Sequence, residues 1–185
     1  SFDANLGIAR SFSSLRDFDQ AKYHLEVALA IEPDSLIALK YLGASVASLG
    51  LFEEAVKIFR DGIKKHPKSE DLFIQLAKLF QDKKDFPASL KVLEHAITSI
   101  GQTERILQNL TIILIKLERV DEAFFYLEQV LEKDPQRTNF CSMRASLSSY
   151  IEGITSEEQL AIAHAYEKSL GIKNEEVYKS WRCNI

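Results

Sequence analysis

The sequence predicts an all-α protein, a right-handed superhelix of stacked antiparallel helix hairpins that ends in a helical cap. One observation is a period, because Pro33, Pro67, Gly101 and Pro135 stand at successive intervals of 34 residues. A second is that apolar residues within each interval are spaced by three and four, as on one face of a helix. A third is that only 7 Gly and 4 Pro occur in 185 residues, which leaves little material for hairpin turns and favours long helices.

Four repeat units are predicted, spanning residues 2–35, 36–69, 70–103 and 104–137. One apolar column is formed by Leu25, Phe59, Leu93 and Leu127. A turn is expected near Arg16, Gly50, Lys84 and Glu118, so that each unit consists of two helices. One hairpin cannot cover its own apolar face, and the units are therefore expected to stack around a continuous core, with the first helix of each unit on the concave side.

Small residues and capping residues support the hairpin within each unit. Ala9, Gly43 and Ala77 on the first helices face Ala21, Ala55 and Ser89 on the second helices, which allows a close approach of the two backbones. Asp17 with Gln20 has the spacing of a capping box, and Pro87 falls in the first turn of a second helix. The helix starts are thus marked independently of the period.

This pattern resembles the tetratricopeptide repeat family, whose 34-residue unit carries aromatic, Leu-Gly, Ala and Pro residues in a fixed order. The second unit matches this order best, through Leu39, Leu42, Gly43, Val46, Gly50, Phe52, Ala55, Phe59, Gly62 and Pro67. The resemblance covers residues 2–137. It implies a protein-protein interaction module that binds a peptide or a partner protein in the concave groove.

Residues 138–185 are predicted to form a helical capping or junction segment. One helix is expected over 138–152, a second from the Thr155 to Glu158 capping box through Leu170, and a short third from Asn174 through Trp181. The order of Thr138, Tyr150, Thr155 to Glu158 and His164 also resembles the segment that joins repeats to the catalytic region in bacterial O-GlcNAc-transferase-like glycosyltransferases. That resemblance implies an alternative, the repeat portion of a glycosyltransferase whose catalytic region is absent from this chain.

Composition and charge narrow the partners. The net charge of -4, from 23 Lys plus Arg and 27 Asp plus Glu, argues against nucleic acid, and no apolar run approaches the length of a membrane span. Cys141 and Cys183 are expected to be reduced thiols in a cytoplasmic protein. The two ends of the chain, Ser1 to Leu6 and Ser180 to Ile185, suggest a fragment of something larger.

Motifs of catalysis and cofactor binding do not occur in the sequence. There is no Gly-rich phosphate loop and no nucleophile elbow, and the four His are scattered singly without the spacing of zinc ligands. The sequence therefore predicts a chain that is not an enzyme by itself and that needs no cofactor and no metal.

The candidate binding residues lie on the first helices, at positions that remain after the core columns are removed. They are Arg10, Lys40, Tyr41, Ile74, Gln75, Lys78, Arg105, Gln108, Asn109 and Ile112. The amide side chains are expected to hydrogen-bond a peptide backbone, and the basic ones to hold acidic groups. The alternative is that these are ordinary solvated residues. Ile112 and Ile115 should be covered by later residues such as Leu160, by a partner, or by another copy through self-association.

Overall fold

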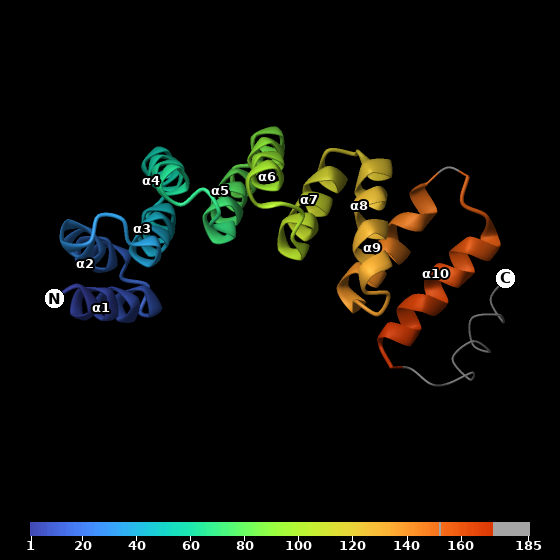
Figure 1. Cartoon of the computed structure of the whole chain (residues 1–185), viewed down its shortest axis with the longest axis horizontal. Coiled ribbons are helices and arrows are strands. Elements are labelled where there is room, and N and C mark those ends of the chain that lie inside the picture. The colour runs from blue at the N-terminus through green and yellow to red at the C-terminus, as the bar shows by residue number, and fades with distance from the viewer. Residues whose placement is uncertain (152, 172–185) are drawn as a thin grey trace. The chain divides into compact units, whose positions relative to one another are not determined.

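Every regular element is a helix in residues 1–151 and 153–171, which are the residues that this computed structural model describes (Figure 1). In chain order the helices are α1 (Phe2–Ser14), α2 (Phe18–Ile31), α3 (Leu36–Ser48), α4 (Phe52–Lys65), α5 (Glu70–Asp82), α6 (Phe86–Ile100), α7 (Glu104–Lys116), α8 (Val120–Lys133), α9 (Thr138–Leu147), the short 3₁₀-helix η1 (Ser148–Tyr150) and α10 (Ser156–Ser169). The all-α prediction is confirmed. None of these helices has the length and apolar character that crossing a membrane requires.

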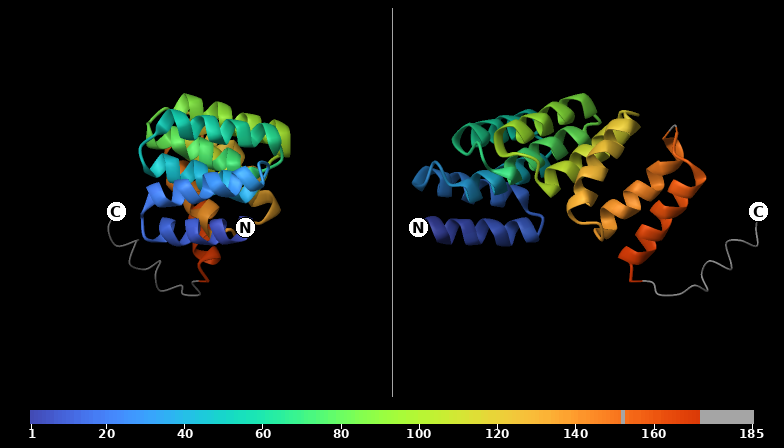
Figure 2. Two further views of the ribbon diagram at one scale, coloured as in Figure 1. Left: turned by 90° about the vertical axis from the view of Figure 1, so that its left-hand side faces the viewer. Right: turned by 45° about the vertical axis from the view of Figure 1, so that its right-hand side comes forward.

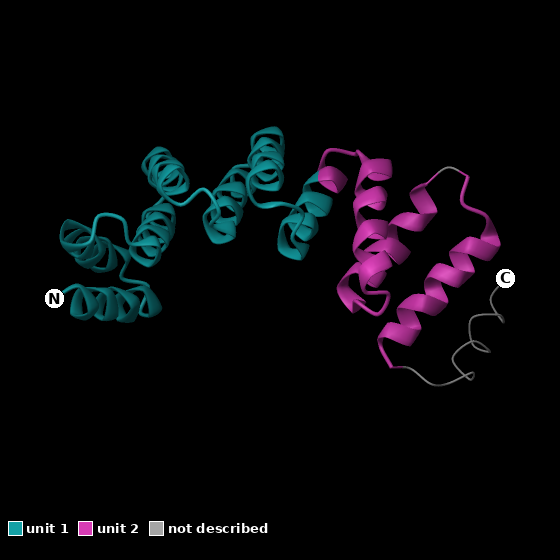
Figure 3. Cartoon of the chain, viewed as in Figure 1, with its two compact units in different colours: residues 1–113 teal, residues 114–185 magenta. Residues whose placement is uncertain are grey.

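The chain forms two compact units, Ser1–Ile113 and Leu114–Ile185 (Figure 3). Unit 1 holds α1 to α6 and most of α7, and the boundary falls inside α7, within the predicted fourth repeat. Consecutive helices from α1 to α6 contact one another, and the first helices α1, α3 and α5 also contact in turn (Figure 2). This contact pattern is that of helix hairpins stacked one on the next.

The predicted turns are visible in the backbone. Arg16, Gly50, Lys84 and Glu118, which are 34 residues apart, all have positive φ, at 62°, 79°, 59° and 59°. At each turn the next residue's N–H donates to a carbonyl five residues earlier, as in Asp17 N to Phe12 O at 2.9 Å. This bond is the signature of the Schellman motif, which satisfies carbonyls at the end of a helix. The repeat therefore extends from side chains to backbone geometry.

Capping residues begin several helices as the sequence indicates. The Asp17 carboxylate accepts a hydrogen bond from Gln20 N at 3.2 Å, and Pro87 lies in the first turn of α6. At α10 the capping box is complete, because Thr155 Oγ1 accepts from Glu158 N at 3.2 Å and Thr155 N donates to the Glu158 carboxylate at 2.8 Å. These bonds satisfy backbone N–H groups that have no partner within the helix.

Small residues permit close packing inside the hairpins of unit 1. At Gly43, a Cβ atom would lie 2.5 Å from Cε1 of Phe59, which is itself only 1% exposed. In the next hairpin, Ser89 is fully buried and its hydroxyl donates to Ala77 O at 3.0 Å. The serine in an alanine column is thus accommodated because its polar atom has a partner.

Unit 2 contains α8, α9, η1 and α10, with α8 against α9 and α9 against α10. The helix predicted over 138–152 is formed by α9 and the short η1. Cys141 is buried with a free thiol, and Gly171, at φ 68°, follows α10 as expected of a glycine after a helix. The third helix predicted from Asn174 through Trp181 lies outside the described residues, as does Cys183.

Candidate functional site

Two adjoining cavities lie between the first helices α3 and α5, with volumes of about 330 and 220 Å³. We call them together the α3–α5 hollow. Both are lined by Ala47, Ser48, Leu79 and Asp82. The first also contacts Gly50, Phe52 and Lys83, and the second Ala44, Phe59, Gln75 and Lys78. The hollow therefore lies on the first-helix surface that the sequence singles out.

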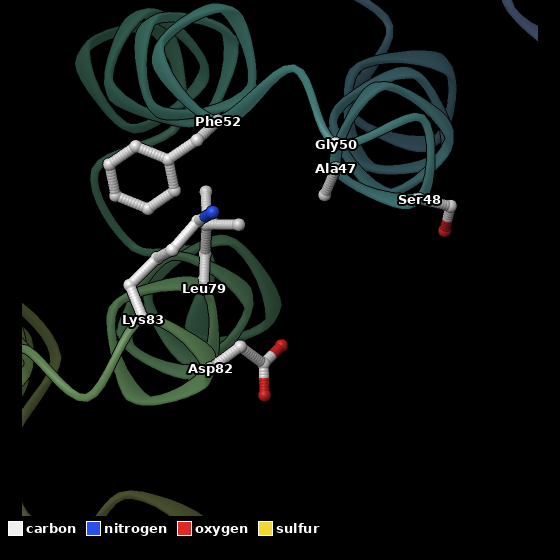
Figure 4. Close-up of a pocket in the computed structure, with 7 residues that line it drawn as sticks. All are labelled: Ala47, Ser48, Gly50, Phe52, Leu79, Asp82 and Lys83. Atoms are coloured by element: carbon white, nitrogen blue, oxygen red, sulfur yellow. The ribbon is translucent and has the colours of Figure 1, made fainter.

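One end of the α3–α5 hollow is apolar and the other is polar. Phe52 and Leu79 point toward each other, whereas Ser48 and Asp82 point away from Phe52 (Figure 4). Phe52 packs edge-on against Phe80, with ring centroids 5.7 Å apart, and Lys83 Nζ lies 5.5 Å from the Phe52 centroid. An apolar ligand group would contact the first end and a hydrogen-bonding group the second.

A polar row on α5 forms one wall of this hollow. Gln75, Lys78 and Asp82 are spaced by three and four residues, so they share one face of the helix. Lys78 and Asp82 are exposed and Gln75 is half-buried. Within the described residues none of the three side chains has a hydrogen-bond or ion-pair partner. Their donors and acceptors are available to a ligand.

Two of the predicted basic residues are already paired inside unit 1. Asp71 receives Lys40 Nζ at 2.9 Å and Arg105 NH1 at 2.9 Å, and Arg105 also reaches Glu70 at 2.9 Å. The Thr103 hydroxyl donates to Glu70 as well. The hydrogen bonds from Lys40 and then Arg105 hold the pKa of Asp71 below its usual value. Lys40 and Arg105 thus differ from Lys78, whose charge is unpaired in the described part of the chain.

Three other candidates contribute to packing or to their own surroundings. Ile74 is only 9% exposed, which corrects its placement on an open stripe. The reason is that α5 contacts α3, α4 and α6, so more of its circumference is covered. Asn109 Nδ2 donates to Arg105 O at 2.8 Å within its own helix, and the Tyr41 ring lies 5.8 Å from the Arg10 guanidinium.

The remaining candidates stay accessible to different degrees. Gln108 is half-buried, and Ile112 is 37% exposed, so its side chain retains an open apolar surface. Leu160, named as a residue that could cover Ile112, is itself 50% exposed. The interpretation of Ile112 as part of a binding surface remains a prediction.

Sequence reasoning missed the C-terminal end of the hollow, which Ser48, Phe52, Asp82 and Lys83 line. A signal was present, because the column of Ser14, Ser48, Asp82 and Lys116 is polar at every interval of 34 residues. A polar position that recurs one helical turn after Lys78 extends the row along the same face.

The repeat, the stacked hairpins and the hollow define a tetratricopeptide repeat protein. The family model of the tetratricopeptide repeat matches residues 3–35. Among curated protein sequences none matches the chain. This fold is typical of protein-protein interaction modules.

Several solved structures share the fold. MamA from Desulfovibrio magneticus RS-1 is 15% identical with a TM-score of 0.68, over 93% of this chain and 94% of that one. YrrB, described as a TPR protein with an unusual peptide-binding site, is 16% identical with a TM-score of 0.62, over 98% and 91%. PilF from Pseudomonas aeruginosa is 17% identical with a TM-score of 0.71, over 94% and 77%. At these identities the likeness shows the fold alone.

The residues behind the glycosyltransferase resemblance lie in unit 2. Thr138 Oγ1 donates to Ser169 O at 3.0 Å and so joins the start of α9 to the end of α10. Tyr150 is 73% exposed. Thr138 thus has a structural role here, and the glycosyltransferase alternative stays a prediction from the sequence.

Proposed function

We propose that this chain is a non-catalytic interaction module that binds an extended peptide segment of a partner protein in the α3–α5 hollow. The observation that carries the proposal is the row of Gln75, Lys78 and Asp82, which lines a cavity without internal partners in the described residues. A helix with a purely structural role has no need of such a row beside an apolar cavity.

The geometry of α5 matches the repeat of an extended chain. Lys78 and Asp82 are four residues apart, which is a rise of about 6 Å along a helix. Alternate residues of an extended peptide are separated by about 6.6 Å and point to the same side. A peptide running along α5 would place an acidic residue beside Lys78 and a basic residue, two positions away, beside Asp82.

The other contacts of the peptide follow from the same arrangement. The Gln75 amide can both donate to and accept from a peptide backbone. Phe52 and Leu79 offer an apolar surface for a side chain between the charged positions (Figure 4). Peptide binding by YrrB, which shares the fold, supports the same use of the fold in this chain.

Lys40 and Arg105 have a positioning role in this proposal, because their charges are directed to Asp71 and Glu70. They connect α3, α5 and the first turn of α7 within unit 1. Replacing them would change how α5 presents its polar row, whereas replacing Lys78 would remove a contact to the ligand.

Selection from a displayed library of random peptides tests the proposal. The full chain is the bait, and affinities of enriched peptides are measured by fluorescence anisotropy. The triple variant Gln75→Ala, Lys78→Ala, Asp82→Ala should bind at least about tenfold more weakly, because each lost hydrogen bond is worth about 0.5–1.5 kcal/mol.

A matched control removes the same three types of side chain elsewhere. Gln20, Glu53 and Lys57 are exposed residues of α2 and α4 and do not line the α3–α5 hollow. Their triple replacement by Ala should change affinity by less than about twofold. Enriched peptides that bind the two triple variants equally would contradict the assignment of the hollow.

A further inference from the structure

A second cavity in unit 1 lies between α4 and α6, over one side of α5, and has a volume of about 360 Å³. We call it the α4–α6 hollow. Its lining residues are Arg60, Ile63, Lys64, Phe73, Leu76, Phe80, Ala88, Lys91, Val92 and His95. None of these lines the α3–α5 hollow, so the two cavities are separate surfaces.

The floor of the α4–α6 hollow is apolar. Ile63, Phe73, Leu76 and Phe80 are buried side chains of α4 and α5. The His95 ring stands edge-on to the Phe73 ring, with centroids 5.1 Å apart and an interplanar angle of 89°. A volume of about 360 Å³ lies at the lower end of the range of small-ligand pockets and gives room for one large apolar side chain.

The rim of the α4–α6 hollow is basic. Arg60 and Lys64 come from α4, Lys91 and His95 come from α6, and no lining residue is acidic. Lys64 pairs with Asp61 at 2.9 Å, but Arg60 and Lys91 have no ion-pair partner among the residues that the structure describes. In a chain of net charge -4, this rim is a local reversal of sign.

From this complementarity we propose that the α4–α6 hollow is a second docking site, which takes an acidic peptide segment of a partner protein with one large apolar anchor. The anchor enters the cavity above Phe73 and Leu76. Carboxylates on either side of the anchor pair with Arg60, which can bind them through two parallel hydrogen bonds, and with Lys91. This site goes beyond peptide binding in the α3–α5 hollow and does not depend on it.

A charge cluster next to an apolar cavity selects its ligand by both properties. A basic segment would be repelled by Arg60 and Lys91, and a purely acidic one would leave the floor uncovered. Only a segment that combines the two fills the cavity and neutralises the rim. The anchor supplies affinity through burial and the carboxylates supply the choice of partner.

Short synthetic peptides test the site. The probes are fluorescein-labelled nine-residue peptides with a central Phe or Leu flanked by Glu and Asp, and two comparison sets carry Lys flanks or a central Ala. Against the full chain, the acidic peptides with the apolar centre should bind at least about tenfold more tightly than either comparison set. Equal binding of the Lys-flanked set, or no binding of the acidic set, would overturn the proposal.

Variants of the chain locate the binding. Arg60→Glu with Lys91→Glu should weaken the acidic probe at least about tenfold, whereas Lys57→Glu with Lys68→Glu makes the same charge change at exposed residues outside the cavity and should change it less than threefold. Thermal melts verify that both double variants are folded. The Gln75, Lys78 and Asp82 triple variant should bind the acidic probe like the unmodified chain.

Two results would refute this location. One is that the two double variants lose affinity equally, which would assign the binding to general charge. The other is a dimer in analytical ultracentrifugation that Arg60→Glu with Lys91→Glu dissociates, because a second copy would then occupy the hollow. Loss of acidic-probe binding in the α3–α5 triple variant would place the probe in the other cavity and would also contradict the proposal.

Discussion

Replacing Gly43 by Ala is the sharpest test of how the second hairpin packs. A Cβ atom at this position would lie 2.5, 2.6 and 2.9 Å from Cε1, Cζ and Cδ1 of Phe59. Ordinary carbon contacts need roughly 3.5 Å or more, so the ring would have to move by about 1 Å. Phe59 is 1% exposed and belongs to the core of unit 1, where such a movement displaces further side chains.

The expected loss of stability is the difference between two effects. Overpacking a well-packed core costs about 1–3 kcal/mol. Replacing a helical Gly by Ala gains about 0.8–1 kcal/mol from helix propensity. Gly43→Ala should therefore lower the free energy of unfolding by about 1–2 kcal/mol. Gly7→Ala provides the control, because Gly7 lies in α1 with no atom within 4 Å of its Cβ position and should gain stability.

Urea unfolding followed by circular dichroism at 222 nm measures both variants. A double-mutant cycle with Phe59→Leu isolates the clash, since a smaller side chain opposite Gly43 makes room for the new methyl group. The double variant should be at least about 1 kcal/mol more stable than the sum of the single changes predicts. A Gly43→Ala protein as stable as Gly7→Ala, with additive effects in the cycle, would refute the close approach of the two helices.

Three further predictions follow from other contacts of the structure. Gly50→Ala should cost about 1 kcal/mol, because φ is +79° although no atom crowds the Cβ position, and its urea midpoint should fall while that of Gly7→Ala does not. The pKa of Asp71 is lowered, so its ion pairs stabilise the fold above its usual pKa and this contribution disappears as the pH falls through the lowered value; unfolding midpoints of the unmodified chain and Asp71→Asn should converge below about pH 4. Thr155→Ala should cost α10 about 1 kcal/mol, seen as faster amide hydrogen exchange in Ser156 to Gln159.

The sequence was sufficient for the hairpins because a repeat reports local requirements several times over. Arg16 and Lys84 illustrate this, since neither residue alone indicates a turn with positive φ, yet both stand 34 residues from Gly50. The column position therefore predicted a conformation that the residue type does not favour. The same redundancy made the small residue at Gly43 recognisable as a packing requirement.

Side-chain pairing between repeats was beyond the columns. Lys40 pairs with Asp71, which lies 31 residues later and not at the column interval of 34. Lys65 pairs with Asp34, which is also 31 residues away. Stacking brings a residue close to the preceding turn of the next unit, so charges must be compared at intervals of about 31 to see these pairs. Without that offset, Lys40 is indistinguishable from Lys78, whose charge has no partner in the described residues.

Helix α5 explains how one unit can present two different surfaces. Seven of its residues are buried, namely Leu72, Phe73, Ile74, Leu76, Ala77, Leu79 and Phe80. Phe73, Leu76 and Phe80 form the floor of the α4–α6 hollow, whereas Gln75, Lys78 and Asp82 face the α3–α5 hollow. Because packing on both sides fixes α5, a peptide in either hollow meets a wall that is already ordered, and little binding energy is needed to order it. The helix that is least exposed in the repeats is therefore the one best suited to hold ligand-binding side chains in place.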